Sequence, residues 1–185
     1  MFRLVLILSI APILAALAAR WWFGLRVLAT EGQEICRINP AKWPEIPGHV
    51  LPEKATAEVL GKLLHDQALA GWRTEYPAAA ASRENSLRFG MAVPPFAAII
   101  AIFTVLIGKT KPIAAIGIFI GSIAVSTLIG LLSLPAELSA ITRTAARLRT
   151  LGALTPSCEA DAVVRCALAT AWLRSLPRVL AFLQR

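Results

Sequence analysis

The residues in this sequence best suited to chemistry are its two histidines, His49 and His65. A zinc protease needs two histidines one helical turn apart with a glutamate beside the first, because both imidazoles must reach one metal ion while the glutamate serves the attacking water. His65 is followed by Asp66, but the position four residues later is Leu69. This spacing supplies no second ligand, and we expect His65 to face solvent on an amphipathic helix.

Nucleophilic catalysis finds no better support. A serine or cysteine nucleophile needs a positioned base, yet the sequence has no G-x-S-x-G, and neither histidine has a recognisable nucleophile partner. The three cysteines, Cys36, Cys158 and Cys166, lack the paired spacing of a disulfide framework or zinc knuckle, so we expect free thiols.

One carboxylate stands apart from the others. Glu137 directly follows Leu134-Pro135-Ala136, where a long apolar run ends. We expect it to begin a helix of about Ala136 to Leu151, ending at Gly152, where the helix dipole favours a negative charge. A lone carboxylate is not a metal site, so Glu137 is at most a vestigial candidate. We predict no catalytic, cofactor-binding or metal site.

The amino-acid composition is that of a membrane protein. The chain is 57% hydrophobic and only 16% charged, against about 25% charged in soluble domains. Its net charge is +8, and the lysines and arginines cluster where hydrophobic runs end. This is the charge pattern that sets the orientation of membrane helices. Nucleic-acid binding, which needs basic residues on one face with interleaved aromatics, is not expected.

Three hydrophobic runs predict membrane helices. Residues 4–19 are uncharged and are followed by Arg20, Trp21 and Trp22, residue types suited to a membrane interface. We expect a transmembrane anchor over residues 1–22; a signal peptide cleaved near residues 16–18 is the alternative. Residues 89–108 and 112–136 are also uncharged and are separated by three residues. They predict a transmembrane hairpin over 89–136.

Small residues recur along the third run. They are Gly117, Gly121, Ser122, Ser126 and Gly130. Small side chains at intervals of four let helix backbones approach closely in lipid, so we expect these residues to pack against another helix. The alternative is that a membrane helix merely tolerates them.

The remaining segments are more polar. Residues 23–88 predict a connector that contains one amphipathic helix at about 53–70. Residues 137–185 predict cytoplasmic or interfacial helices. Within them, 163–183 is apolar but carries Arg165, Arg174 and Arg178. Charges at mid-bilayer are costly, so we expect an interfacial amphipathic helix there. A short span over about 163–173 is the alternative.

Arginines near the membrane are concentrated on the side that holds residues 20–88 and the C-terminal tail. The positive-inside rule places both in the cytoplasm. The expected fold class is therefore an all-α membrane protein with an N-terminal anchor helix, a central transmembrane hairpin and amphipathic C-terminal helices. We expect it to reside in a bacterial inner membrane.

The C-terminal half resembles the membrane-bound neutral zinc metallopeptidases. In that family a helical hairpin leads into L-P-V-E-F-[DN]-A-S and later G-x-L, and residues 134–140 and 152–154 read L-P-A-E-L-S-A and G-A-L here. Thr56-Ala57-Glu58-Val59 is similar to the family's G-A-E-V helix. The family's H-E-A-G-H segment has no counterpart in residues 71–88. The resemblance implies a relative that has lost its protease core, with Glu137 at a former ligand position.

These observations favour a non-catalytic accessory or scaffold subunit, without a cofactor, that packs against a larger membrane complex. Its partners would be the lipid bilayer and another membrane protein. The alternative is a metallopeptidase-like enzyme whose zinc site a partner chain completes, with ligands from His65, Asp66 and Glu137. A small transporter lacks support, because no acidic residue lies within a run to carry an ion.

Overall fold

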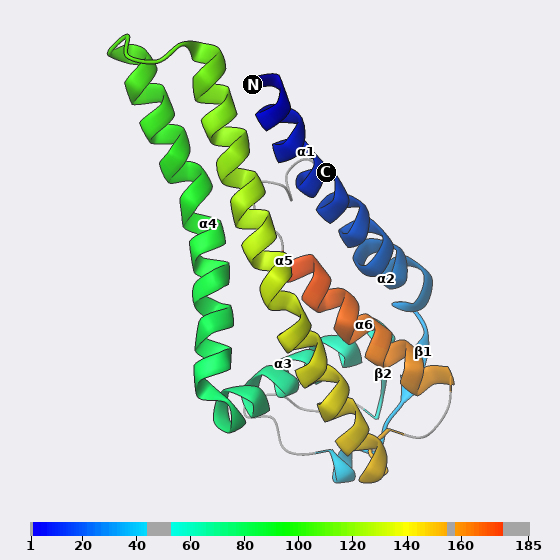
Figure 1. The fold of residues 1–185 in the computed structure, drawn as a ribbon. Helices are drawn as coiled ribbons and strands as arrows, with labels where there is room; N and C mark the ends of the chain where they lie inside the picture. The colour runs from blue at the N-terminus through cyan, green and yellow to red at the C-terminus, as the bar shows by residue number, and fades with distance from the viewer. Residues whose placement is uncertain (1, 44–52, 155–157, 176–185) are drawn as a thin grey trace. The chain divides into compact units, whose positions relative to one another are not determined.

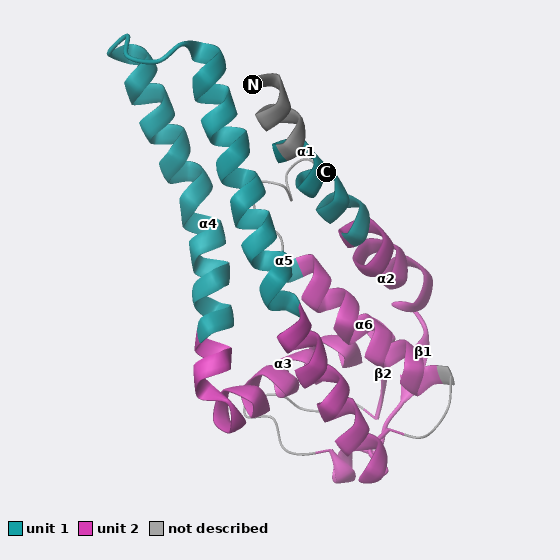
Figure 2. Ribbon diagram, viewed as in Figure 1, with its two compact units in different colours: residues 1–19, 82–134, 174–185 teal, residues 20–81, 135–173 magenta. Residues whose placement is uncertain are grey.

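The computed structural model describes residues 2–43, 53–154 and 158–175. It is mostly helical and contains three helices long and apolar enough to cross a membrane, which confirms the expected helical class (Figure 1). The chain divides into two compact units, shown in Figure 2. Unit 1 comprises residues 1–19, 82–134 and 174–185, and unit 2 comprises residues 20–81 and 135–173.

The first long helix extends beyond the predicted anchor. Helix α1 (Phe2–Arg20) continues through a π-helical turn, η1 (Trp21–Leu25), into α2 (Arg26–Glu31). Residues 23–31 were expected in the connector but are helical, because they contain no proline and the helix tolerates Gly24 before it ends at Gly32. The apolar stretch capable of spanning a membrane is Ser9–Glu31.

The predicted hairpin is formed by α4 (Pro77–Leu106) and α5 (Pro112–Thr150), whose segments in unit 1 run side by side in Figure 1. Gly108 in the connecting turn has φ +73°, a conformation that glycine adopts without strain. Both helices are longer than their apolar runs. Helix α4 begins at Pro77 because Arg83, Glu84 and Arg88 interrupt the hydrophobic run without breaking the helix.

The prediction of a new helix at Ala136 is wrong. Helix α5 continues through Pro135, and Glu137 lies in its interior, where the N-terminal dipole has no influence. The predicted end is confirmed: the helix stops at Thr150, and Gly152 has φ +70°.

Unit 2 also contains strands that were not predicted. β1 (Ile35–Arg37) pairs antiparallel with β2 (Lys54–Thr56), and the 3-10 turn η2 (Pro40–Lys42) follows β1. Three-residue strands are too short to show a hydrophobic period. The amphipathic helix expected at about 53–70 is α3 (Ala57–Glu75), which begins where β2 ends.

Helix α6 (Cys158–Arg174) covers the first part of the predicted interfacial helix and packs in the interior of unit 2. Ala162, Val163, Cys166, Ala167 and Ala169 are all fully buried. Small side chains on several faces let neighbouring elements approach it closely. The rest of the predicted interfacial helix, including Arg178, lies outside the described residues.

Each unit has its own apolar core. In unit 1, Ala16 of α1 packs with Ile123 of α5, together with Ile13, Leu17, Phe119 and Leu131. In unit 2 the largest buried apolar side chains come from α3, α5, α6 and the segment after α5. They are Leu60, Leu64, Ile141, Leu148, Leu154 and Val163.

Candidate functional site

The most unusual polar contact in unit 2 joins His65 of α3 to Glu137 of α5. His65 Nε2 lies 2.7 Å from Glu137 Oε1, and the two side chains are 0% and 3% exposed. The expectation that His65 faces solvent is therefore wrong. Gly61, His65, Ala68 and Trp72 recur at helical intervals and are all buried, so the histidine belongs to the core stripe of α3.

The second imidazole nitrogen faces another carboxylate. His65 Nδ1 lies 3.4 Å from Asp66 Oδ1, and the Asp66 side chain is half exposed. With Glu137 ionised, Nε2–H is the donor to it. The three residues named for the alternative zinc site thus lie together, although 72 positions separate His65 from Glu137.

This geometry does not fit two ligands of one zinc ion. Zinc holds nitrogen and oxygen ligands at about 2.0–2.2 Å in a tetrahedron, so the two ligand atoms would lie roughly 3.3 Å apart. The separation of 2.7 Å is that of a direct hydrogen bond. Among the described residues, no group of three or more His, Cys, Asp or Glu side chains is arranged to hold a metal. His49 lies outside the described residues.

Two thiols lie in the interior of the same unit. Cys36 and Cys166 are free and buried. Burial, reinforced by Glu34 and Glu159, raises the pKa of Cys36 to about 11. Burial likewise raises the pKa of Cys166 to about 12, with Glu31 adding to the effect. Both are neutral at pH 7 and unsuited to nucleophilic attack.

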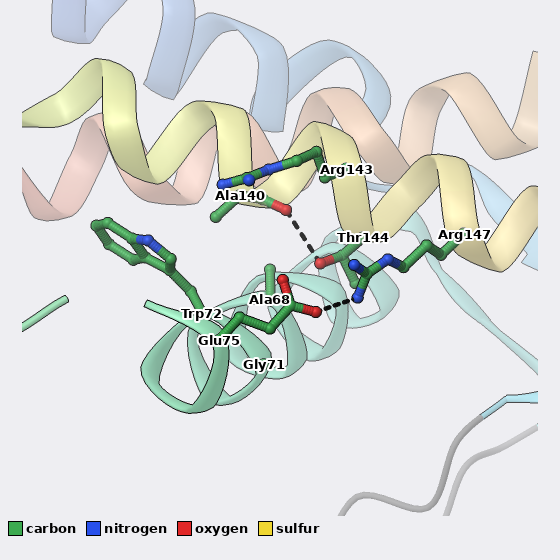
Figure 3. A pocket seen from close by; sticks show the side chains of 8 residues that line it. All are labelled: Ala68, Gly71, Trp72, Glu75, Ala140, Arg143, Thr144 and Arg147. Atoms are coloured by element: carbon green, nitrogen blue, oxygen red, sulfur yellow. Dashed lines mark hydrogen bonds and ion pairs between the residues drawn. The ribbon is translucent and has the colours of Figure 1, made fainter. Parts of the chain in front are cut away.

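A small hollow of about 20 Å³, roughly the space of one water molecule, lies between α3 and α5. Figure 3 shows Glu75 of α3 turned toward Arg147 of α5. Arg147 donates to Glu75 Oε1, and this hydrogen bond lowers the pKa of the Glu75 carboxyl. Arg143 lies over the Tyr76 ring at 5.1 Å. The rim is thus a surface ion-pair cluster around a hollow too small for an organic substrate.

The small residues of α5 occupy two faces of the helix. At about 100° per residue, Gly121 and Ser126 point about 140° apart. Ser126 and Gly130 are buried within unit 1: Ser126 lies against Gly90 of α4, and a Cβ on Gly130 would overlap the Ser175 carbonyl oxygen. A Cβ on Gly121 would meet nothing within 4 Å. Only part of the predicted packing stripe is therefore used within the chain.

Sequence reasoning did not identify Arg83 as a buried residue. It is 4% exposed, and its Nη1 donates to the Gly130 carbonyl oxygen at 2.7 Å and to Ser133 Oγ at 2.6 Å. These bonds tie α4 to α5 in unit 1. Arg83 lies among polar residues before an apolar run, and nothing in that sequence context predicts that its side chain is buried.

Comparison of the chain with models of protein families, with curated proteins and with solved structures gave no match. The resemblance to the zinc metallopeptidases rests on the sequence motifs alone.

Proposed function

We propose that this protein is a non-catalytic integral membrane subunit that binds a transmembrane helix of a larger membrane complex. The proposal is carried by the face of α5 that contains Gly117 and Gly121. These residues form a G-x-x-x-G pair, a spacing that lets two helix backbones approach closely in lipid.

The surroundings of this pair suit a helix partner. Its face also carries Val125, Leu128 and Leu132, which are 50%, 44% and 79% exposed. The opposite face, with Ser126 and Gly130, is already occupied within unit 1. The two glycines let the backbone of a partner helix approach closely, and the larger aliphatic side chains beside them add van der Waals contact.

The His65–Glu137 pair supports a structural role for unit 2. Both partners are buried, both ring nitrogens face carboxylates, and the hydrogen bond joins two helices. In this function unit 2 is a folded domain on the cytoplasmic side of a bacterial inner membrane. Residues 20–88 and the C-terminus face the cytoplasm, as the arginine distribution favours.

The test is native purification of the full-length chain after membrane-permeable cross-linking, comparing wild type with Gly121→Ile. Because a side chain at 121 meets open space, the variant should keep the thermal stability of the isolated chain while losing the cross-linked partner. Leu128→Ile, a volume-conserving change on the same face, is the matched control and should retain the partner. Unchanged cross-linking of Gly121→Ile, or a product containing only a second copy of this chain, would overturn the proposal.

A second candidate follows from the proximity of His65, Asp66 and Glu137. In it, a partner chain supplies further ligands and rearranges the pair around zinc. Metal analysis of the natively purified complex separates the two functions. Stoichiometric zinc that is lost in Glu137→Ala but retained in Glu58→Ala would favour the metallopeptidase-like enzyme over the scaffold.

A further inference from the structure

Arg20, at the junction of α1 and η1, differs from the other arginines of unit 2. Its Nε and Nη1 atoms are buried, yet they have no hydrogen-bond partner within the described part of the chain. Arg147, Arg149 and Arg165 each pair with a carboxylate. Burying guanidinium nitrogens without acceptors destabilises the folded state, because they lose their hydrogen bonds to water and gain none from the protein.

None of the ion pairs recorded among the described residues involves Arg20. The nine residues 16–24 contain no carboxylate, and the nearest one along the chain, Glu31, is bound to Arg165 at 2.7 Å. The other ion pairs recorded among the described residues engage carboxylates elsewhere. These are Glu58 with Lys62, Glu75 with Arg147, Glu84 with Arg88, Asp161 with Arg149, and Asp66 and Glu137 with His65.

The turn that begins directly after Arg20 is tightly packed. Arg20 precedes Gly24 by four residues, about one helical turn, so both point to the same side. A Cβ on Gly24 would lie 2.9 Å from Leu173 Cδ2 of α6, and Phe23 stacks on Trp172 at 5.2 Å. The turn after Arg20 therefore packs closely against α6 within unit 2.

The residues after Arg20 are of types that concentrate at membrane interfaces. Trp21 and Trp22 are each 53% exposed, and the Arg26 guanidinium lies 4.2 Å from the centre of the Trp22 ring. Tryptophan concentrates at the level of lipid headgroups. Arginine there extends its long side chain so that the charged end reaches the phosphates.

We propose that Arg20 binds the phosphate of an anionic phospholipid at this interface. The inference rests on the membrane location in the proposed function. A phosphodiester supplies the charge and the oxygen acceptors that the chain lacks, and the planar guanidinium fork can donate two parallel hydrogen bonds to it. No hydrogen bond from the described residues holds Nε and Nη1 in their buried position, and binding requires the side chain to turn toward the headgroup.

The experiment uses the full chain in detergent, stripped of lipid, with native mass spectrometry and thermal unfolding as readouts. Phosphatidylglycerol is the probe, and diacylglycerol with the same acyl chains lacks only the phosphate headgroup. Phosphatidylglycerol should bind and raise the wild-type Tm, and Arg20→Gln should weaken this binding about tenfold or more. Arg37→Gln removes an equal charge from an exposed position on β1 and should bind like wild type.

Two further comparisons distinguish lipid binding from a role of Arg20 in stabilising the fold. Without lipid, Arg20→Gln should be at least as stable as wild type, because it removes a cation without a partner; a lower Tm would indicate a structural arginine and overturn the site. Equal binding of phosphatidylglycerol by wild type and Arg20→Gln, or equal binding of diacylglycerol, would also overturn it. Saturable binding of inorganic phosphate at Arg20 would assign the site to a soluble anion instead.

The outcome is separable from that of the proposed function. Lipid binding is measured on the isolated chain, where no partner is present, and Gly121→Ile should leave it unchanged. Loss of the protein partner in Gly121→Ile would therefore stand even if Arg20 bound no lipid.

Discussion

His65 Nε2 and Glu137 Oε1 lie 2.7 Å apart and join α3 to α5 in the interior of unit 2. Neither side chain is more than 3% exposed. If one of them is removed, water cannot reach the other to replace the lost hydrogen bond. The contact acts between segments that are 72 positions apart in the chain.

Glu137→Ala should lower the free energy of unfolding by about 1–3 kcal/mol, the cost of a buried polar group without its partner. Glu137→Gln, which keeps an acceptor oxygen, should cost less. Thermal unfolding in detergent, followed by tryptophan fluorescence, measures both. Asp66→Asn is the control: its 3.4 Å contact is half exposed, and the change should stay within about 0.5 kcal/mol. An equal loss in Asp66→Asn would show that the buried pair is not the dominant contact.

The two longer apolar runs, residues 89–108 and 112–136, were enough to predict the hairpin, because runs of twenty or more uncharged residues leave few alternatives. The first run, residues 4–19, is shorter, and its prediction also depended on the Arg20-Trp21-Trp22 that follows it. They did not predict where those helices end. Arg83, Glu84 and Arg88 interrupt the hydrophobic run of α4 but are all acceptable within a helix. A helix boundary depends on backbone hydrogen bonds, whereas a hydropathy pattern reports only side-chain polarity.

The buried pair could not be predicted from local pattern. His65 directly follows Leu64, and a single histidine beside a leucine stripe fits either the edge of the core or the solvent face. What decides is Glu137, whose position opposite α3 depends on α5 continuing through Pro135. A proline inside a helix usually marks a boundary, so the sequence predicted a new helix at Ala136 and gave no reason to expect Glu137 in the interior of a long one.

Gly61 should be intolerant of any side chain. A Cβ there would lie 2.7 Å from the Cβ of Cys166 and 2.9 Å from the Ala167 backbone nitrogen, so α3 and α6 would have to separate. Gly61→Ala should destabilise the protein by about 1–3 kcal/mol through overpacking. Gly71→Ala, in the same helix with nothing within 4 Å of its Cβ, should instead stabilise by up to about 1 kcal/mol. Equal effects at both positions in thermal unfolding would contradict the close crossing.

The orientation proposed for the membrane can be tested with two exposed positions on opposite sides. Lys109→Cys lies in the hairpin turn and Arg37→Cys lies on β1. A membrane-impermeant maleimide applied to intact cells should label Lys109→Cys, while Arg37→Cys should react only after permeabilisation. The reverse pattern would invert the orientation, and labelling of both positions in intact cells would contradict membrane insertion.

The buried thiols predict a pH dependence of stability. Cys36 and Cys166 have folded-state pKa values of about 11 and about 12, above the ordinary value of 9.0, because burial disfavours the thiolate. A raised pKa means that the folded state holds its protons more tightly. The stabilisation is therefore complete below pH 9 and is lost as the pH rises toward 11 and 12.

The matching experiment uses Cys158→Ser, so that only these two thiols remain. Iodoacetamide at pH 8 should modify neither while the protein is folded and both after denaturation, as read by mass spectrometry. Cys36→Ser/Cys166→Ser in the same background should lose less stability between pH 8 and pH 10.5 than its parent, because serine does not ionise in that range. Rapid alkylation of the folded protein at pH 8 would show that the thiols are accessible and ionise near their ordinary pKa.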